Sequence, residues 1–345
     1  MTKVTIQDVA KELGLSRNTV AKALNNSDKV SWETRFLVVE KAYEMGYSKL
    51  SPVVLNQFKI HNKTAKTKTI VVLARRELSV FWNSIILGIS DELNKNGCKL
   101  QINFISEQDE RELVTPLELQ GDISGIIMLS VFSPEYVEKI VNQNTPVVFL
   151  DGPVDLDTHN QYGDTILCEG KNSVRKITES LIDKGFKKIG FIGDITYCKS
   201  IYDRYRGYAE ALQAAGIPLD ESVIASYHAK SRFYAIEDVR MALARFAYIP
   251  DAIVCANDDI ALDVIKCLKE KGLSVPNDVA VTGYDDVESM SQFEPFLTTV
   301  KVDNQRLGRR LVQQLIWRSE NETFPNEIIY IGVEVINRKS SERRI

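Results

Sequence analysis

The chain has 345 residues, of which 44% are hydrophobic and 26% charged, and its formal net charge is −4. This length exceeds what one hydrophobic core usually supports, so we expect two or three folding units. The composition excludes a disordered or fibrous chain, and no apolar run reaches the roughly 18–20 residues that a membrane-spanning helix needs.

The N-terminus has no apolar signal segment, so we expect a cytoplasmic protein that makes no contact with a membrane. The five cysteines are odd in number and none forms a CxxC pair, which indicates reduced thiols. None of the three histidines is close in sequence to a cysteine or to another histidine, so we expect neither a metal nor a cofactor.

Charge is distributed unevenly along the chain. Residues 1–68 hold 12 Lys and Arg against 6 Asp and Glu, whereas the remaining residues hold 31 against 41. A basic N-terminal segment on an acidic body suggests that a polyanion binds the first segment only.

Three short helices are predicted at the N-terminus. Thr5 can cap a helix over residues 6–13, Asp8 can complete its capping box, and Gly14 can end it in the left-handed conformation. Ser16 and Ser31 can cap a second and a third helix, each with an apolar stripe. Two short helices joined by a tight glycine turn and braced by a third indicate a helix-turn-helix.

In this motif the second helix enters the major groove of DNA. Its exposed residues here are Arg17, Asn18 and Lys22, whose side chains can pair with guanine or adenine edges. Small polar side chains that suit phosphate contacts lie nearby: Ser16, Thr19, Asn25 and Thr34. The alternative is a helical cap with a solvated charged face.

The stretch VTIQDVAKELGLSRNTVAKALNNSDKVSWETRFLVVEKAYEMGY resembles the DNA-binding headpiece of the lactose-repressor (LacI/GalR) family. The resemblance implies that Arg17, Asn18 and Lys22 read the operator. The family usually has Ser-Arg where this chain has Ala21 and Lys22, so we expect an operator that differs from the common family palindrome.

The linker also departs from the family pattern. The family continues into a hinge helix whose leucine wedges into the minor groove, and here Ser51 and Pro52 can begin such a helix over residues 52–58. Leu55 and Phe58 are both candidates for the wedge. The basic stretch 61–68 then serves as a tether, with its lysines either on phosphates or in solvent.

From residue 70 onward, short apolar strands alternate with amphipathic helices, a pattern typical of parallel sheets covered on both faces. The predicted strands are 70–74, 99–105, 125–129, 147–150, 165–168, 188–192, 252–255 and 279–283. The predicted helices between them include 82–96, 170–184, 203–215, 234–246 and 258–271. This number of strands predicts two lobes with a ligand in the cleft between them.

Polar groups suited to a polyhydroxylated ligand follow several of these strands. Asp151, Asn257 and Asp285 stand at strand ends, and Arg204 and the pair Phe81-Trp82 lie near helix starts. Carboxylates and amides can bind vicinal hydroxyls, Arg donates in a fork, and an aromatic face packs on a sugar ring. Taken singly, each has another reading: an Asp at a strand end is often a helix cap, and an aromatic is often core.

The resemblance to the LacI/GalR family extends over nearly the whole chain. It is carried by FWNSIILGI, PVVFLD, LIDKGFKKIGFIG, RYRGYAEALQAAGI, ANDDIAL, VPNDVAVTGYDD, FLTTVKVD and VEVINRKS. It implies that the effector is contacted by Trp82, Asp151, Arg204, Asn257 and Asp285, with Phe81 as a weaker candidate. Where the family usually has Asp-Asn, this chain has Glu169 and Gly170.

The resemblance implies an all-α helix-turn-helix headpiece (1–50), a hinge and linker (51–69) and an α/β, two-lobed, periplasmic-binding-protein-like sensor domain with parallel sheets (70–340). The first lobe would comprise 70–162 and 300–322, and the second 163–297 and 325–340. No apolar heptad tail is present at the C-terminus, so we expect a homodimer on a palindromic operator.

We therefore predict a DNA-binding transcriptional regulator, a repressor controlled by a sugar-like effector. The alternatives are a regulator that responds to a nucleoside or to a protein co-repressor, and an intracellular sugar-binding protein that does not bind DNA. An enzyme is disfavoured because the chain contains no P-loop, no G-x-S-x-G and no HExxH.

Overall fold

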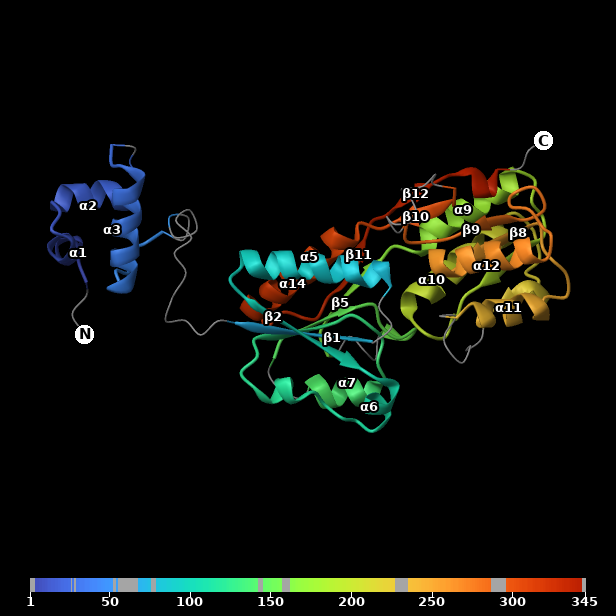
Figure 1. The fold of residues 1–345 in the computed structure, drawn as a ribbon, viewed down its shortest axis with the longest axis horizontal. Coiled ribbons are helices and arrows are strands. Elements are labelled where there is room, and N and C mark those ends of the chain that lie inside the picture. Colours follow the sequence, from blue (N-terminus) through green and yellow to red (C-terminus); the bar gives the residue numbers. More distant parts are fainter. Residues whose placement is uncertain are drawn as a thin grey trace. The chain divides into compact units, whose positions relative to one another are not determined.

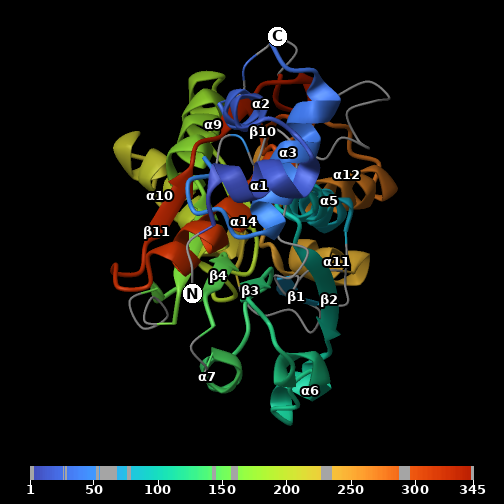
Figure 2. The ribbon, with the colours of Figure 1, turned by 90° about the vertical axis from the view of Figure 1, so that its left-hand side faces the viewer.

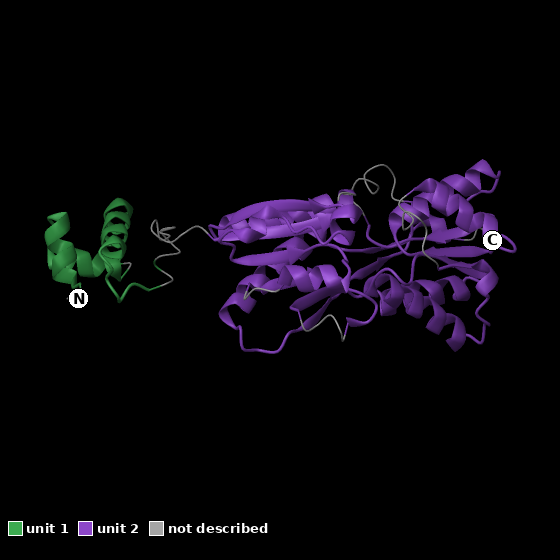
Figure 3. Cartoon of the chain, turned by 90° about the horizontal axis from the view of Figure 1, so that it is seen from below, with its two compact units in different colours: residues 1–67 green, residues 68–345 purple. Residues whose placement is uncertain are grey.

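The computed structural model of the chain divides into two compact units, residues 1–67 and residues 68–345 (Figure 3). The structure describes residues 4–25, 27, 29–51, 54, 68–75, 79–141, 145–156, 162–226, 235–286 and 296–342. Each unit has a hydrophobic core of its own, as expected of separately folding domains.

The described part of the first unit contains the helices α1 (Ile6–Leu13), α2 (Arg17–Leu24) and α3 (Trp32–Glu44). The backbone N–H of Thr5 donates to the Asp8 carboxylate at 2.8 Å, and the Thr5 hydroxyl in turn accepts from the Asp8 N–H. Gly14 follows α1 with φ 64°, a left-handed conformation that glycine adopts without strain. The predicted capping box, glycine stop and helix order are confirmed.

The apolar stripes of α1, α2 and α3 meet around Val9, Val20 and Val38, which are fully buried. Val54 is helical and is buried in one cluster with Val39. The remainder of the predicted hinge helix, including Leu55 and Phe58, lies outside the described residues.

The first lobe of the second unit is built on a parallel sheet with the strand order β11-β5-β4-β3-β1-β2. Its strands are β1 (Thr69–Arg75), β2 (Lys99–Ile105), β3 (Gly125–Met128), β4 (Val147–Leu150), β5 (Asp164–Cys168) and β11 (Ile328–Ile331). Strands β3, β4 and β5 are buried along their whole length, as expected of parallel strands covered on both faces.

Helices cover both faces of this sheet (Figures 1 and 2). One face carries α5 (Val80–Lys95) and α14 (Asn304–Glu320), and the other carries α6 (Glu107–Arg111) and α7 (Pro134–Val141). The backbones of α5 and α14 cross closely, because a Cβ at Gly88 would lie 2.1 Å from the Gln305 carbonyl oxygen. Only glycine fits at this crossing.

The second lobe has a parallel sheet in the order β7-β6-β8-β9. Its strands are β6 (Ile189–Ile192), β7 (Ile224–Ala225), β8 (Ala252–Cys255) and β9 (Ala280–Thr282). Its helices are α9 (Lys171–Asp183), α10 (Lys199–Ala214), α11 (Ile236–Arg245) and α12 (Asp258–Glu270), with α9 packed on α10 and α11 on α12. A separate antiparallel pair joins β10 (Thr299–Lys301) to β12 (Glu334–Ile336).

The expected division between the lobes is corrected at two strands. Residues 163–297 and 325–340 were assigned to the second lobe, but β5 pairs with β4, and β11 pairs with β5, in the sheet of the first lobe. The chain therefore enters the second lobe after Cys168 rather than at residue 163. A parallel strand of a few residues can pair in either sheet, so its pairing partner cannot be read from its own residues.

Candidate functional site

The predicted recognition helix α2 presents its polar side chains to solvent. Ser16, Arg17, Asn18 and Lys22 are exposed, as is Asn25 at the end of the helix, while Thr19 is partly buried. The Ser16 hydroxyl accepts from the Thr19 N–H at 3.0 Å and thereby caps α2. Because Val20 and Ala23 anchor the opposite face in the core, the orientation of this surface is fixed.

The start of α3 lies in the same small unit and repeats this arrangement. The Ser31 hydroxyl accepts from the Thr34 N–H at 3.3 Å and lies 3.0 Å from the Thr34 hydroxyl. Thr34 is partly buried, with its hydroxyl held beside the helix N-terminus. Helix N-termini and hydroxyls both suit phosphate oxygens.

In the second unit, all six residues predicted to contact an effector line one pocket of about 150 Å³: Phe81, Trp82, Asp151, Arg204, Asn257 and Asp285. This volume is many times the roughly 10–15 Å³ that one water molecule needs. The lining includes residues of β4 and β5 in the first lobe and of α10 and α12 in the second. The pocket therefore lies where both lobes can contact one ligand.

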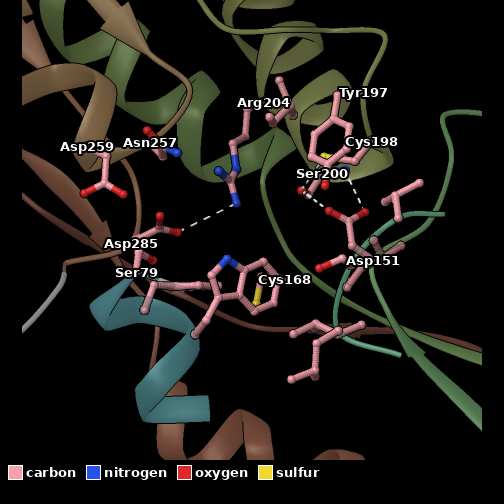
Figure 4. A pocket seen from close by; sticks show the side chains of 18 of the residues that line it. Ser79, Asp151, Cys168, Tyr197, Cys198, Ser200, Arg204, Asn257, Asp259 and Asp285 are labelled. Atoms are coloured by element: carbon pink, nitrogen blue, oxygen red, sulfur yellow. Dashed lines mark hydrogen bonds and ion pairs between the residues drawn. The ribbon is translucent and has the colours of Figure 1, made fainter. Parts of the chain in front are cut away.

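Arg204 of α10 extends into this pocket and is only 7% exposed (Figure 4). Its Nη1 donates to the Ala256 carbonyl oxygen at 2.6 Å, and its guanidinium carbon lies 3.5 Å from the centre of the Tyr284 ring. Its Nη2 lies 3.9 Å from an Asp285 carboxylate oxygen, too far for a hydrogen bond. Its Nε has no hydrogen-bond partner, so Arg204 is held firmly while keeping donor capacity.

Gly170, one of the two departures from the family pattern in this region, gives Arg204 its space. A Cβ at residue 170 would lie 2.9 Å from the Arg204 Cγ. The preceding residue, Glu169, accepts from the backbone N–H groups of Asn172 (2.5 Å) and Ser173 (3.0 Å) at the start of α9. Glu169 is thus a helix cap, and Gly170 allows the close passage of the arginine stem.

Asp285 follows β9 in a conformation that is rare for residues with a side chain, with φ 123°. Of the four described non-glycine residues with positive φ, Asp151 and Asp285 follow strands and line the pocket. Such strain concentrates at binding sites because surrounding structure must hold it in place. Burial raises the pKa of Asp285 well above its usual range, opposed by the attraction of Arg204.

The carboxylate of Asp151 is already engaged inside the protein. It accepts from the Gly152 N–H at 2.8 Å, from the Ser200 N–H at 3.2 Å and from the Ser200 hydroxyl (Figure 4). Asp151 follows β4 in the first lobe, whereas Ser200 lies in the first turn of α10 in the second. A ligand that uses Asp151 must share it with the bonds that join the lobes.

Asn257 is both a helix cap and a pocket residue. Its side-chain oxygen accepts from the Ile260 N–H at 2.9 Å and so caps α12. The side chain also lines the pocket. Because the oxygen is used by the helix, the amide NH₂ is the group that Asn257 can offer to a ligand.

An aromatic wall lies at the start of α5. Phe81 and Trp82 pack edge to face, with ring centroids 5.1 Å apart, and both line the pocket. The lining also contains residues that the sequence did not single out: Ser79, Asp194, Tyr197, Ser200 and Asp259. Ser200 and Asp259 stand in first turns of helices after strand ends, which was the only signal available for them.

Two cysteines line the pocket, but neither is suited to nucleophilic chemistry. Burial raises the pKa of the Cys168 thiol to about 12 and raises that of Cys198 as well, so both stay protonated at neutral pH. Within the described residues, no group of three or more His, Cys, Asp or Glu side chains could hold a metal ion. No helix in the same residues is long and apolar enough to cross a membrane.

Comparisons with known proteins match both units. Residues 5–49 match the model of bacterial regulatory proteins of the lacI family, and residues 178–341 match the periplasmic binding protein-like domain. The HTH-type transcriptional repressor PurR of Pasteurella multocida (strain Pm70) is 28% identical over an alignment of 351 positions, gaps included, which covers 99% of each chain.

Solved structures share the fold. A complex of the transcriptional regulator CelR with cellobiose aligns with a TM-score of 0.68 at 24% identity, over 98% of this chain and 100% of the other. The lac repressor dimer bound to operator and the anti-inducer ONPF aligns with a TM-score of 0.66 at 23% identity, over 99% of each chain.

Proposed function

The chain belongs to the LacI family of bacterial regulatory proteins, and we propose that it is a repressor whose operator affinity is controlled by a sugar bound between the lobes of its sensor unit. Like its relatives, it is a DNA-binding transcription regulator and not an enzyme. We expect it to act in the cytoplasm, where its DNA is accessible.

DNA reading is assigned to α2. Arg17 and Lys22 donate to guanine, Asn18 pairs with adenine, and the hydroxyls of Ser16, Thr19 and Thr34 contact phosphates, together with the exposed Asn25. Leu55 remains the proposed minor-groove wedge, with Phe58 as its alternative. A homodimer places two such helices on the two halves of a palindrome, an arrangement that fits the operator-bound dimer of the lac repressor.

The proposal of a hydroxylated ligand rests on the distance between the Arg204 guanidinium and the Asp285 carboxylate. A hydroxyl group between them would accept from the guanidinium and donate to the carboxylate, bridging a separation of 3.9 Å that is too long for a direct bond. The Asn257 amide adds a donor, and Phe81 and Trp82 offer apolar faces to a sugar ring. CelR, of the same fold, is seen with cellobiose.

Control of DNA binding would follow from the bonds that join the lobes at the pocket. The Asp151 carboxylate accepts from Ser200 across the lobes, and a sugar beside Asp151 competes with or reinforces that contact. Ligand shifts the equilibrium between lobe arrangements only by its difference in affinity for them. The arrangement of the lobes then sets how the two headpieces of a dimer are held.

Fluorescence anisotropy on promoter DNA tests this function. The full chain is titrated onto DNA from its own promoter region at two salt concentrations, with and without a panel of sugars and nucleosides. We expect saturable binding to one palindrome, tighter than to a scrambled duplex, and a change in affinity with one sugar. Equal binding to scrambled DNA would contradict the regulator, and a response to nucleosides alone would contradict the sugar.

A further inference from the structure

The described lining of the pocket contains more carboxylates than cations. Four aspartates, Asp151, Asp194, Asp259 and Asp285, face a single arginine, Arg204, and no lysine. Carboxylates accept hydrogen bonds and do not donate them when ionised. A ligand must therefore bring donors, and negative charge on the ligand would be unfavourable.

These carboxylates differ in how they are used. Asp151 accepts from Gly152 and Ser200, and Asp194 accepts from the N–H and the hydroxyl of Thr196 at 3.0 and 2.7 Å. Asp285 lies opposite Arg204. Asp259 differs from them, because no group in the described residues hydrogen-bonds its carboxylate or forms an ion pair with it.

Asp259 stands in the first turn of α12, two residues after the cap Asn257. Figure 4 shows Asn257, Asp259 and Asp285 on one side of Arg204, and Asp151 with Ser200 on the other. Asp259 is itself exposed, and partial desolvation, followed by the charge of Asp263, raises its pKa. Together with the neighbouring Asp285, this disfavours further negative charge beside Asp259.

Arg204 is the cation in the described lining that could compensate a ligand anion, and it is already partly used. One guanidinium nitrogen is bound to the Ala256 carbonyl, the guanidinium stacks on Tyr284, and Asp285 lies opposite the other terminal nitrogen. A ligand carboxylate or phosphate would have to compete with Asp285 for the same cation. A hydroxyl does not, because it both accepts and donates.

We propose that Asp259 is a specificity-determining residue that restricts the effector to uncharged, hydroxyl-rich sugars and excludes their uronate and phosphate forms. This inference rests on the proposed function, since it concerns the ligand of the same pocket. A neutral sugar donates a hydroxyl to the unused Asp259 carboxylate. A uronate or sugar phosphate adds negative charge beside it.

Matched sugars test the charge preference. Binding of glucose, glucuronate and glucose 6-phosphate, of the corresponding galactose series, and of ribose and ribose 5-phosphate is measured by titration calorimetry on the full chain. We expect the neutral member of the series that binds to be preferred at least tenfold. An anionic member that binds as tightly as its neutral partner would overturn the proposal.

Asp259→Asn tests the residue itself, with Asp183→Asn as the control, because Asp183 is exposed at the end of α9 and does not line the pocket. The preference for neutral over anionic sugar should fall about tenfold in Asp259→Asn and persist in Asp183→Asn. An unchanged preference in Asp259→Asn would overturn the assignment.

A ligand-free measurement separates this inference from the proposed function. Replacing the unpaired carboxylate with a neutral amide should raise the Tm of the full chain by about 2 °C, because a charge without a partner held near other carboxylates destabilises the fold. A lower Tm would mean that Asp259 serves α12 as a first-turn acid, and would overturn the proposal. If no sugar binds, the proposed function is contradicted, whereas the Tm of Asp259→Asn still tests the inference about Asp259.

Discussion

On the recognition helix the polar side chains are exposed, whereas in the sensor pocket they are buried. Arg17 and Asn18 extend into solvent, while Arg204 and Asp285 are 7% and 9% exposed. Arg17 and Asn18 lose their hydration only when DNA binds. The second pair is desolvated when the chain folds, so its members contribute to stability as well as to ligand binding.

DNA binding and ligand binding should therefore respond differently to substitution. Changes on α2 should alter DNA affinity and leave the free energy of unfolding unchanged. Changes in the pocket should alter both stability and ligand binding.

The largest effect is expected for Arg204→Ala. It removes the stacking on Tyr284 and the bond to Ala256, and it leaves Asp285 buried without a cation, so the sensor unit should lose about 3 kcal/mol of stability. Urea unfolding measures this loss. Arg206→Ala on the same helix is the control, because Arg206 is exposed and, among the described residues, its ion pair is with Glu210 at 3.1 Å. A similar loss in both variants would contradict the role of burial.

Arg17→Ala should weaken specific DNA binding by about 2 kcal/mol, the discrimination of one good base contact, with nonspecific binding largely kept. The midpoint of urea unfolding should not change, because the side chain is exposed. Anisotropy on operator and scrambled duplexes measures both affinities. Equal weakening on the two duplexes would assign Arg17 to phosphate rather than to a base.

Gly170→Ala should destabilise the sensor unit by about 1–2 kcal/mol, because the added Cβ would lie 2.9 Å from the Arg204 Cγ. A double-mutant cycle checks the cause. In an Arg204→Ala background there is no Cγ, so the cost of Gly170→Ala should largely disappear. Additive losses would show that the glycine is needed for another reason.

The last effect concerns pH. The folded-state pKa of Asp285 is raised, so its contribution to stability is fully present below about pH 4 and is lost as pH rises through the raised value. Relative to Asp285→Asn, the wild type should lose stability as pH rises above about 4, with a slope of at most about 1.4 kcal/mol per pH unit. Urea unfolding of both proteins from pH 4 to 8 tests this. Parallel curves would mean that Asp285 is not perturbed.

Local signals made the headpiece predictable from the sequence. Thr5, Asp8 and Gly14 determine the first helix through contacts within ten residues, and Ser16 and Ser31 do the same for the next two. Most strands of the sensor unit were also predicted, because their apolar runs are bounded by polar residues. The short β7, and the pairing of β5 and β11 with the first sheet, depend on distant partners and left no local signal.

The pocket was predicted in part. Strand ends pointed to Asp151 and Asp285, and the resemblance to the family strengthened both predictions. Residues whose position depends on packing between elements were missed: Ser200 lies beside Asp151 across the lobes, and Gly170 matters only because Arg204 passes over it. The effector contacts of Asp151 and Asp285 remain predictions, which binding measurements must test.

The most direct test of two separable functions is a crossed comparison of Arg17→Ala and Arg204→Lys. For each variant and the wild type, operator affinity is measured by anisotropy, and sugar binding by titration calorimetry. We expect Arg17→Ala to lose operator binding and keep sugar binding, and Arg204→Lys to keep operator binding and lose its response to sugar. Loss of both activities together in either variant would contradict the account.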